Sequence, residues 1–228
     1  GRVLVSIGYV PIEEYSFFVI QTVLTCLWFL AVLERHSLES RIAAIAGTSP
    51  YTENVAHSSG AGALSSRPGS ATMRMGGAAI LVLCALFAWR LVLTGPDHYL
   101  YMALIMGWGL PVLALQWAFG GHVTWKERIL VFNGLAFPTL FLWLADALAI
   151  EMNIWSINSR YLLGIYVGTL PVEEMIFFTI TNLMVLQGSL LFVRVSERMD
   201  SLSTEGKKGS QSSSKTFVSR IWQAALRL

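Results

Sequence analysis

The sequence PVEEMIFF at residues 171–178 places two adjacent carboxyl groups at the start of an apolar run that reaches Phe192. A second stretch, PIEEYSFF at residues 11–18, has the same spacing and begins an apolar run that extends to about Leu33. The two copies lie 160 positions apart, and in this register Gly8 matches Gly168 and Ile20 matches Ile180. The spacing therefore indicates an internal repeat.

Each residue type in the Pro-x-Glu-Glu motif has a physical reason for its place. Proline lacks an amide hydrogen and has a fixed φ, so it suits the first turn of a helix. The glutamates would face the unpaired amides and the positive end of the helix dipole. An ordinary N-terminal cap needs only one acid, and ionisable groups in membrane segments are costly and usually functional. We therefore predict a catalytic site at Glu13, Glu14, Glu173 and Glu174.

The composition predicts an all-α, multi-pass transmembrane helical bundle. Of the 228 residues, 54% are hydrophobic and 13% are charged, which is too apolar for an ordinary soluble domain. The net charge of +2 is small and spread over loops and a tail, which argues against a nucleic-acid partner. Cys26 and Cys84 lie within apolar segments and imply neither a disulfide nor a metal site.

Five apolar segments are long enough to cross a hydrocarbon core of about 30 Å. Gly107, Gly109 and Pro111 predict a kink or close helix packing in the third of them. Asp146, one turn before the end of the fourth, fits a water-facing cap and a site role about equally. A flexible loop is expected over residues 36–72, which are rich in Ser, Ala and Gly. The segments cover about residues 11–33, 76–93, 98–119, 129–150 and 171–193.

The distribution of basic residues predicts the orientation in the membrane. Lys and Arg number four in the first connection, none in the second, two in the third, one in the fourth and seven in the tail from Arg194. By the positive-inside rule the long first loop and the C-terminal tail are cytoplasmic. Both Pro-x-Glu-Glu helices then start on the other side and run parallel. If each repeat has three helices and one helix links them, the full domain has about seven.

Two regions of different character are expected along the chain. Residues 1–194 form the integral-membrane domain; because the chain opens inside the first repeat without an initiator methionine, this domain is expected to be N-terminally truncated. Residues 195–228 are expected to form a polar linker and, from Lys215, an amphipathic helix that lies on a membrane surface or leads to a further domain.

The doubled motif followed by Phe-Phe resembles the membrane-integral, non-flavin lycopene cyclases. The likeness covers nearly all of residues 1–193, and the long loop, the second helix and the tail look most like the N-terminal half of the fungal bifunctional lycopene cyclase/phytoene synthases. It implies lycopene and related linear carotenes as substrates, a lipid bilayer as surroundings, and a fused or associated phytoene synthase. The chain has no Asp-x-x-x-Asp pair for a prenyl diphosphate, so phytoene synthase activity is not expected from these residues.

The chemistry of such a cyclisation fits the residues. An acid protonates a terminal double bond, the carbocation closes a ring, and a base removes a proton, so no redox cofactor is needed. Two neighbouring buried carboxyl groups tend to share one proton and thus offer one acid and one anion. Four aromatic rings could stabilise the cation, and Asn182 could contact the substrate or, with Gln21, join helices. The rings belong to Phe17, Phe18, Phe177 and Phe178.

Three other functions fit parts of the sequence. A proton-coupled transporter also uses paired membrane carboxylates, but it predicts polar residues deeper along the path. An intramembrane Glu-Glu protease needs an arginine shortly after the acids, where this chain has Ser16 and Ile176. A membrane scaffold would not explain why both acids are duplicated. The transporter is therefore the main alternative.

Overall fold

Five long helices make up almost all of the described structure. The computed structural model describes residues 6–7, 10–45 and 68–208. Each helix contains a segment long and apolar enough to cross a membrane, the shortest having 24 residues. The all-helical architecture agrees with the predicted multi-pass bundle. The helices are α1 (Ile12–Ile45), α2 (Pro68–Thr94), α3 (Leu100–Lys126), α4 (Arg128–Glu151) and α5 (Val172–Lys208).

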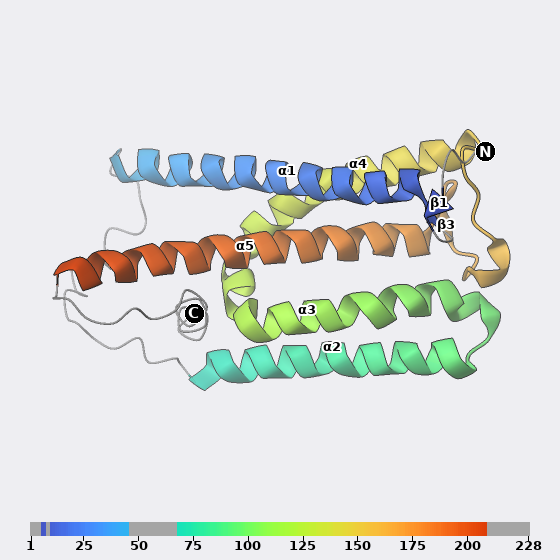
Figure 1. Ribbon diagram of the computed structural model, residues 1–228, viewed down its shortest axis with the longest axis horizontal. Helices are drawn as coiled ribbons and strands as arrows, with labels where there is room; N and C mark the ends of the chain where they lie inside the picture. The colour runs from blue at the N-terminus through green and yellow to red at the C-terminus, as the bar shows by residue number, and fades with distance from the viewer. Residues whose placement is uncertain (1–5, 8–9, 46–67, 209–228) are drawn as a thin grey trace.

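Helix α5 is the centre of the bundle, because α1, α3 and α4 all pack against it. Helix α2 packs mainly along α3 and lies at the edge (Figure 1). Helices α1 and α5 start at the same end of the molecule and run in the same direction, whereas α4 crosses the bundle obliquely (Figure 1). The segments that precede α1, α3 and α5 therefore gather at one end.

Two helices continue well beyond the apolar runs that predicted them. Helix α1 extends to Ile45 and α2 begins at Pro68, so both ends of the loop expected over residues 36–72 are helical, and residues 46–67 lie outside the described part of the chain. Helix α5 extends to Lys208, so the first part of the expected linker 195–228 is helical. Neither extension contains proline, and ion pairs one turn apart support both: Arg35 with Glu39, and Arg194 with Glu197. The amphipathic segment from Lys215 lies outside the described residues.

Of the two alternatives predicted from Gly107, Gly109 and Pro111, helix α3 shows close packing at the two glycines, whereas its kink lies further along the helix. The backbone leaves helical geometry at Gly120, with φ −142° and ψ 22°, whereas the helix passes through Pro111 without such a break. Trp89 of α2 donates a hydrogen bond of 3.0 Å to the carbonyl of Gly107. A Cβ atom on Gly109 would come within 2.7 Å of Ile180, so this glycine permits close packing of α3 on α5.

Each of the two Pro-x-Glu-Glu helices follows a short β-hairpin, which the sequence did not predict. The first joins β1 (Ser6–Ile7) to β2 (Val10–Pro11), and the second joins β3 (Tyr166–Val167) to β4 (Leu170–Pro171). Ser6 pairs with Pro11, and Tyr166 pairs with Pro171. The paired residues of the second hairpin therefore lie 160 positions after those of the first, so the two hairpins have the same register. Gly168 turns the second hairpin with a φ of +64°, which favours glycine.

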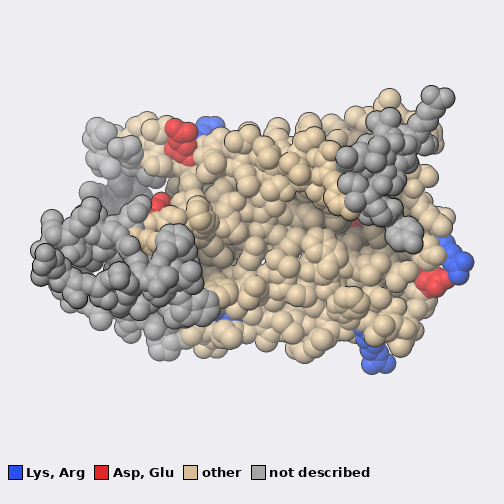
Figure 2. All heavy atoms as spheres, viewed as in Figure 1, with Lys and Arg blue, Asp and Glu red and all other residues tan. Residues whose placement is uncertain are grey.

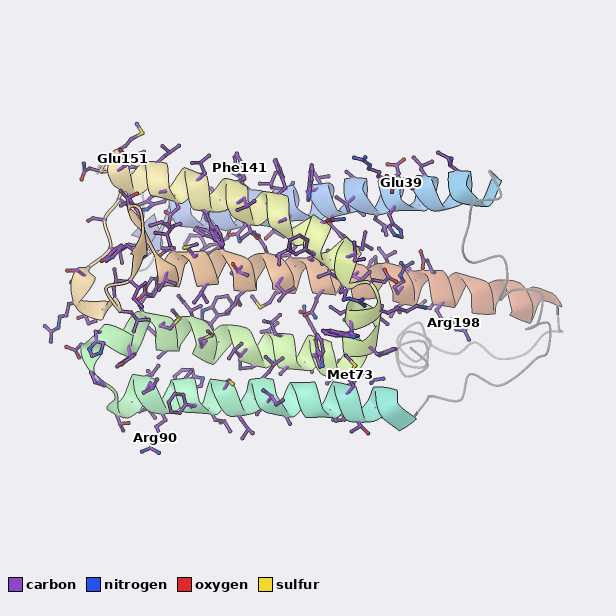
Figure 3. The ribbon with its side chains drawn as sticks, turned by 180° about the vertical axis from the view of Figure 1, so that it is seen from behind. Glu39, Met73, Arg90, Phe141, Glu151 and Arg198 are labelled. Atoms are coloured by element: carbon purple, nitrogen blue, oxygen red, sulfur yellow. The ribbon has the colours of Figure 1, made fainter. Side chains whose placement is uncertain are left out.

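Apolar side chains cover the outside of the bundle as well as its core. Two buried clusters line α5: one around Phe29 and Leu186, the other around Ile105 and Ile180. On the face drawn in Figure 2, charged side chains gather toward the two ends of the molecule. Phe141 projects from the outer side of α4 (Figure 3) and is 51% exposed. An apolar exterior between charged ends is the surface that a lipid bilayer requires.

Candidate active site

Glu173 lies in the first turn of α5 and is completely buried. Its Oε1 atom accepts a hydrogen bond of 2.5 Å from the backbone amide of Leu163, in the segment between α4 and α5. Its Oε2 atom is also buried and has no hydrogen-bond partner among the described residues. A carboxyl oxygen in this position can carry a proton or face a ligand, because no group of the described residues engages it.

Glu174, the next residue, is almost as buried as Glu173 but has a different neighbour. Its Oε1 atom accepts a short hydrogen bond from the hydroxyl of Tyr101, which lies in the first turn of α3. Helices α3 and α5 begin at the same end of the bundle (Figure 1), which brings residues 73 positions apart into contact. Adjacent helix positions point about 100° apart, so the two glutamates reach different partners.

Asp146 is a third buried carboxyl group at this end of the molecule. It is 4% exposed, and its Oδ1 atom accepts a hydrogen bond of 2.9 Å from the indole of Trp155. Its Oδ2 atom has no partner in the described part of the chain. Asp146 lies close enough to Glu174 and Tyr101 to interact with both electrostatically. The water-facing cap that the sequence allowed for Asp146 is therefore wrong.

The four predicted phenylalanines come together between α1 and α5. Phe17 lies 5.8 Å from Phe178, and Phe18 lies 6.0 Å from Phe177, measured between ring centroids. Both contacts are edge-to-face, a favoured geometry for aromatic pairs. The ring of Trp108 on α3 extends the cluster, 6.3 Å from Phe177. Shifting each residue to its counterpart 160 positions away turns the Phe17–Phe178 contact into the Phe177–Phe18 contact. Contacts across a twofold axis are related in the same way.

Asn182 is buried two turns further along α5, in a polar network that joins three helices. Its Oδ1 atom accepts hydrogen bonds from Gln21, at 3.1 Å, and from Thr25, at 2.9 Å, both on α1. Its Nδ2 atom donates to Thr139 of α4 at 3.1 Å. Gln21 also donates to Thr181 at 2.6 Å. The amide of Asn182 is thus engaged by protein groups on both of its polar atoms.

Glu13 and Glu14 occupy the first turn of α1, but their side chains lie outside the part of the structure that is described. Tyr101 was missed by the sequence analysis. Nothing near it in the chain marks it as a partner of a carboxylate, and only its place at the start of an apolar run could have raised the question. In the described ranges no cluster of metal-binding side chains is present.

These features define an all-helical, multi-pass membrane protein with buried carboxyl groups and aromatic rings at one end of its bundle. The chain is 36% identical over 198 residues to the lycopene beta-cyclase of Halobacterium salinarum, covering 87% of this chain and 71% of that protein. It is a member of the lycopene beta-cyclase family, which is a family of enzymes. Glu173 and Glu174 therefore lie in a protein whose relatives are named lycopene cyclases.

Fungal relatives extend the comparison. The bifunctional lycopene cyclase/phytoene synthase of Sporisorium reilianum is 32% identical over 199 residues, which cover 83% of this chain and 25% of that protein. The corresponding protein of Blakeslea trispora is 30% identical over 181 residues, with 79% and 26% covered. No family model matches the chain. No solved structure matches it either.

Proposed function

We propose that this protein is a lycopene β-cyclase that converts the linear ends of lycopene to β-ionone rings by acid–base chemistry. The observation that carries the proposal is the buried carboxyl group of Glu173, with one oxygen unengaged by the described residues. Glu174 and Asp146 are buried beside it. A cyclase needs such a group, because an alkene is a very weak base and accepts a proton only from an acid shielded from water.

The reaction consists of one proton gain and one proton loss. A carboxylic acid protonates the terminal double bond, and the resulting tertiary cation is attacked by the neighbouring double bond of the same chain. A six-membered ring forms, and a carboxylate removes a proton to leave the ring double bond. Glu173 and Glu174 supply the acid and the base, and Glu13 and Glu14 of α1 complete the site. No electrons enter or leave, so the reaction is an isomerisation.

The aromatic cluster supports the cationic part of this reaction. Phe17, Phe18, Phe177 and Phe178 lie within one to two turns of the glutamates on α1 and α5. Ring faces stabilise a desolvated cation by about 2 kcal/mol. Phe18 is 43% exposed and Phe178 only 2%, so the cluster extends from the surface of the described bundle into its interior. A carotene in the bilayer could approach the carboxyl groups along these rings.

For Asn182 we propose a structural role in place of direct contact with the substrate. Both of its polar atoms are engaged by Gln21, Thr25 and Thr139. Buried polar groups that are fully paired hold helices in one arrangement, whereas breaking such a network exposes unpaired groups to an apolar interior. Asn182 then fixes α1 against α5 and thereby sets the spacing of the two phenylalanine pairs.

We further propose that the two hairpin–helix units are copies of one repeat with parallel helices. The common register of the hairpins and the exchanged phenylalanine contacts support this relationship. In a complete domain two further helices would pack on α1 as α3 and α4 pack on α5, which gives about seven helices. The distribution of basic residues supports a cytoplasmic position for the loop after α1 and for the C-terminal tail.

Residues 1–194 are proposed to form the cyclase domain, and residues 195–228 to lead out of it. The fungal relatives also carry the name phytoene synthase, but the chain covers only about a quarter of the length of the two described above. It contains no Asp-x-x-x-Asp pair. The proposed activity of these residues is therefore cyclisation alone, with a fused or separate phytoene synthase as a partner.

Pigment analysis in lycopene-producing bacteria tests the proposed function. Cells that express the full-length protein should convert lycopene to carotenes with one or two β-ionone rings. The Glu173→Gln variant keeps the size of the side chain but removes its acid, and it should leave lycopene unconverted. Immunoblotting would show that both proteins reach the same level in the membrane.

Glu151→Gln is the matched control. Glu151 ends α4 at the same end of the bundle (Figure 3) and is exposed. Its variant should form cyclic carotenes at the wild-type rate. If well-expressed wild-type protein leaves lycopene untouched, the cyclase proposal fails and the proton-coupled transporter becomes the leading alternative.

A further inference from the structure

The two adjacent glutamates of α5 have unlike hydrogen-bond partners. Glu174 accepts the hydroxyl hydrogen of Tyr101. Glu173 accepts a backbone amide on one oxygen and has no partner among the described residues on the other. Both side chains are buried, so solvent does not erase the difference. The Glu-Glu motif, which is symmetric as a sequence, is therefore chemically asymmetric in the fold.

The direction of the Tyr101 bond bears on the role of Glu174. A tyrosine hydroxyl has a single hydrogen, and here that hydrogen points to Oε1 of Glu174. A carboxyl oxygen that accepts a hydroxyl hydrogen bond is stabilised as the anion, and such charge-assisted bonds are short. This hydrogen bond favours the anion of Glu174, which is the form that accepts a proton. A proton on Oε2 of Glu173, in contrast, would have no acceptor among the described groups and would be available to a substrate.

We infer that Tyr101 is a positioning residue that holds Glu174 as the base of the cyclisation, leaves Glu173 as the acid, and thereby decides which proton the ring cation loses. This inference rests on the proposed cyclase function. Tyr101 is well placed for the task, because its ring packs against the buried cluster around Ile105 and Ile180 that joins α3 to α5. Its hydroxyl is therefore fixed by the helix packing rather than by a mobile loop.

The position of the base matters because the ring cation can lose a proton from three places. Loss from the ring carbon attached to the polyene chain gives the conjugated β-ionone ring. Loss from the ring methylene beside the cationic carbon gives an ε-type ring, and loss from the methyl group on the cationic carbon gives an exocyclic double bond. All three products have the same composition as lycopene. Only the place of the base, relative to the bound cation, selects among them.

The test compares wild type with Tyr101→Phe, which removes the hydroxyl and keeps the ring. Membranes from bacteria that express the full-length proteins would be supplied with lycopene in D₂O buffer. In both proteins each ring formed should carry one deuteron from the acid step. A displaced base removes the proton more slowly as well as less selectively. Ring formation by Tyr101→Phe should therefore be roughly tenfold slower. A substantial fraction of its ring ends should also have a shifted or exocyclic double bond.

Tyr99→Phe is the matched control, since Tyr99 lies two positions earlier, is partly exposed and has its ring against His98. It should give only β-ionone ends at the wild-type rate. Should Tyr101→Phe fail to fold, Glu174→Asp provides a second variant, because it withdraws the base by one methylene while Tyr101 stays, and it should misplace the double bond in the same way.

Two results would overturn the inference. The first is exclusively β-ionone ends from a folded Tyr101→Phe variant at any rate, because Tyr101 would then not select the proton. The second is a folded variant with no deuteron uptake and no consumption of lycopene, because the acid step through Glu173 should survive. Failure of wild type to convert lycopene would instead remove the proposed function itself, so the two failures are distinguishable.

Discussion

The first and second hairpin–helix units begin alike and end up in different surroundings. Both pair their strands in the same register, and both enter a helix directly after the proline. Ile180 of α5 is 7% exposed, whereas Ile20, 160 positions earlier on α1, is 65% exposed. Leu190 is fully buried, and its counterpart Leu30 is 49% exposed. This difference in exposure shows that the local sequence sets where a helix starts, whereas the burial of the helix depends on which elements pack beside it.

The surroundings also decide which carboxyl groups have partners. In the second unit Glu174 meets Tyr101 of α3 and Glu173 meets the amide of Leu163. Both partners come from the chain between α2 and α5, which packs on the second unit. In the proposed mechanism the second unit therefore supplies the acid and the base, and Glu13 and Glu14 of the first unit complete the site.

The largest expected effect is an asymmetry between the two glutamate pairs. Glu173→Gln should lower cyclisation by roughly a thousandfold, because general acid catalysis contributes a factor of about 10² to 10⁴. Glu13→Gln at the equivalent position of α1 should cost much less if the second unit supplies the acid. Rates of lycopene loss at matched protein levels would measure both. Equal losses in the two variants would remove the functional difference between the units.

A smaller effect is expected from truncating equivalent leucines. Leu190→Ala should lower the free energy of unfolding by about 3 kcal/mol, because a fully buried leucine leaves a cavity. Leu30→Ala, on the outer side of α1, should change it by less than about 0.5 kcal/mol. Denaturant titration in detergent micelles would compare the two. A large loss from Leu30→Ala would mean that α1 is covered in the intact protein, which would support further helices packed on it.

The polar network should show the same contrast at lower magnitude. Asn182→Ala leaves the hydroxyls of Thr25 and Thr139 without this partner, at a cost of about 1 to 2 kcal/mol. Thr22 is the equivalent position on α1, is exposed, and within the described residues donates its hydroxyl hydrogen to the carbonyl of Phe18 in its own helix. Thr22→Ala should therefore be nearly neutral. Melting temperatures in detergent micelles would compare the two variants. Similar decreases in both would argue against a structural role specific to Asn182.

The smallest effect concerns the surface ion pair between Arg160 and Asp97, at 2.5 Å. It joins the connection between α4 and α5 to the connection between α2 and α3. Asp97 raises the pKa of Arg160 above its ordinary value. The contribution of Arg160 is therefore fully present below that ordinary pKa and is lost only at higher pH, so it should not vary around neutrality. Asp97→Asn should shift the melting temperature slightly in dilute buffer and not at high salt. A large, salt-independent shift would contradict this.

Parts of the site were accessible from the sequence, and others were not. The glutamates and phenylalanines were found because the motif repeats, and repetition is visible without a structure. Tyr101 and the burial of Asp146 were not accessible, because both depend on contacts between helices far apart in the chain. Gly8 and Gly168 each precede a proline of the motif by three residues, and a glycine at this spacing also fits a turn before each helix.

The five apolar segments and the doubled motif, from which the acid–base chemistry is proposed, could be read from the sequence, because hydrophobic length, residue type and spacing are properties of the chain alone. The different hydrogen-bond partners of Glu173 and Glu174 became visible in the fold alone, since these partners come from other parts of the chain that pack nearby. The tertiary structure also decided that Asn182 is engaged on both polar atoms and that Phe17 meets Phe178 rather than Phe177. Hydrogen-bond partners and ring contacts depend on the three-dimensional arrangement, because residues that are equivalent in sequence become distinct only when their neighbours differ.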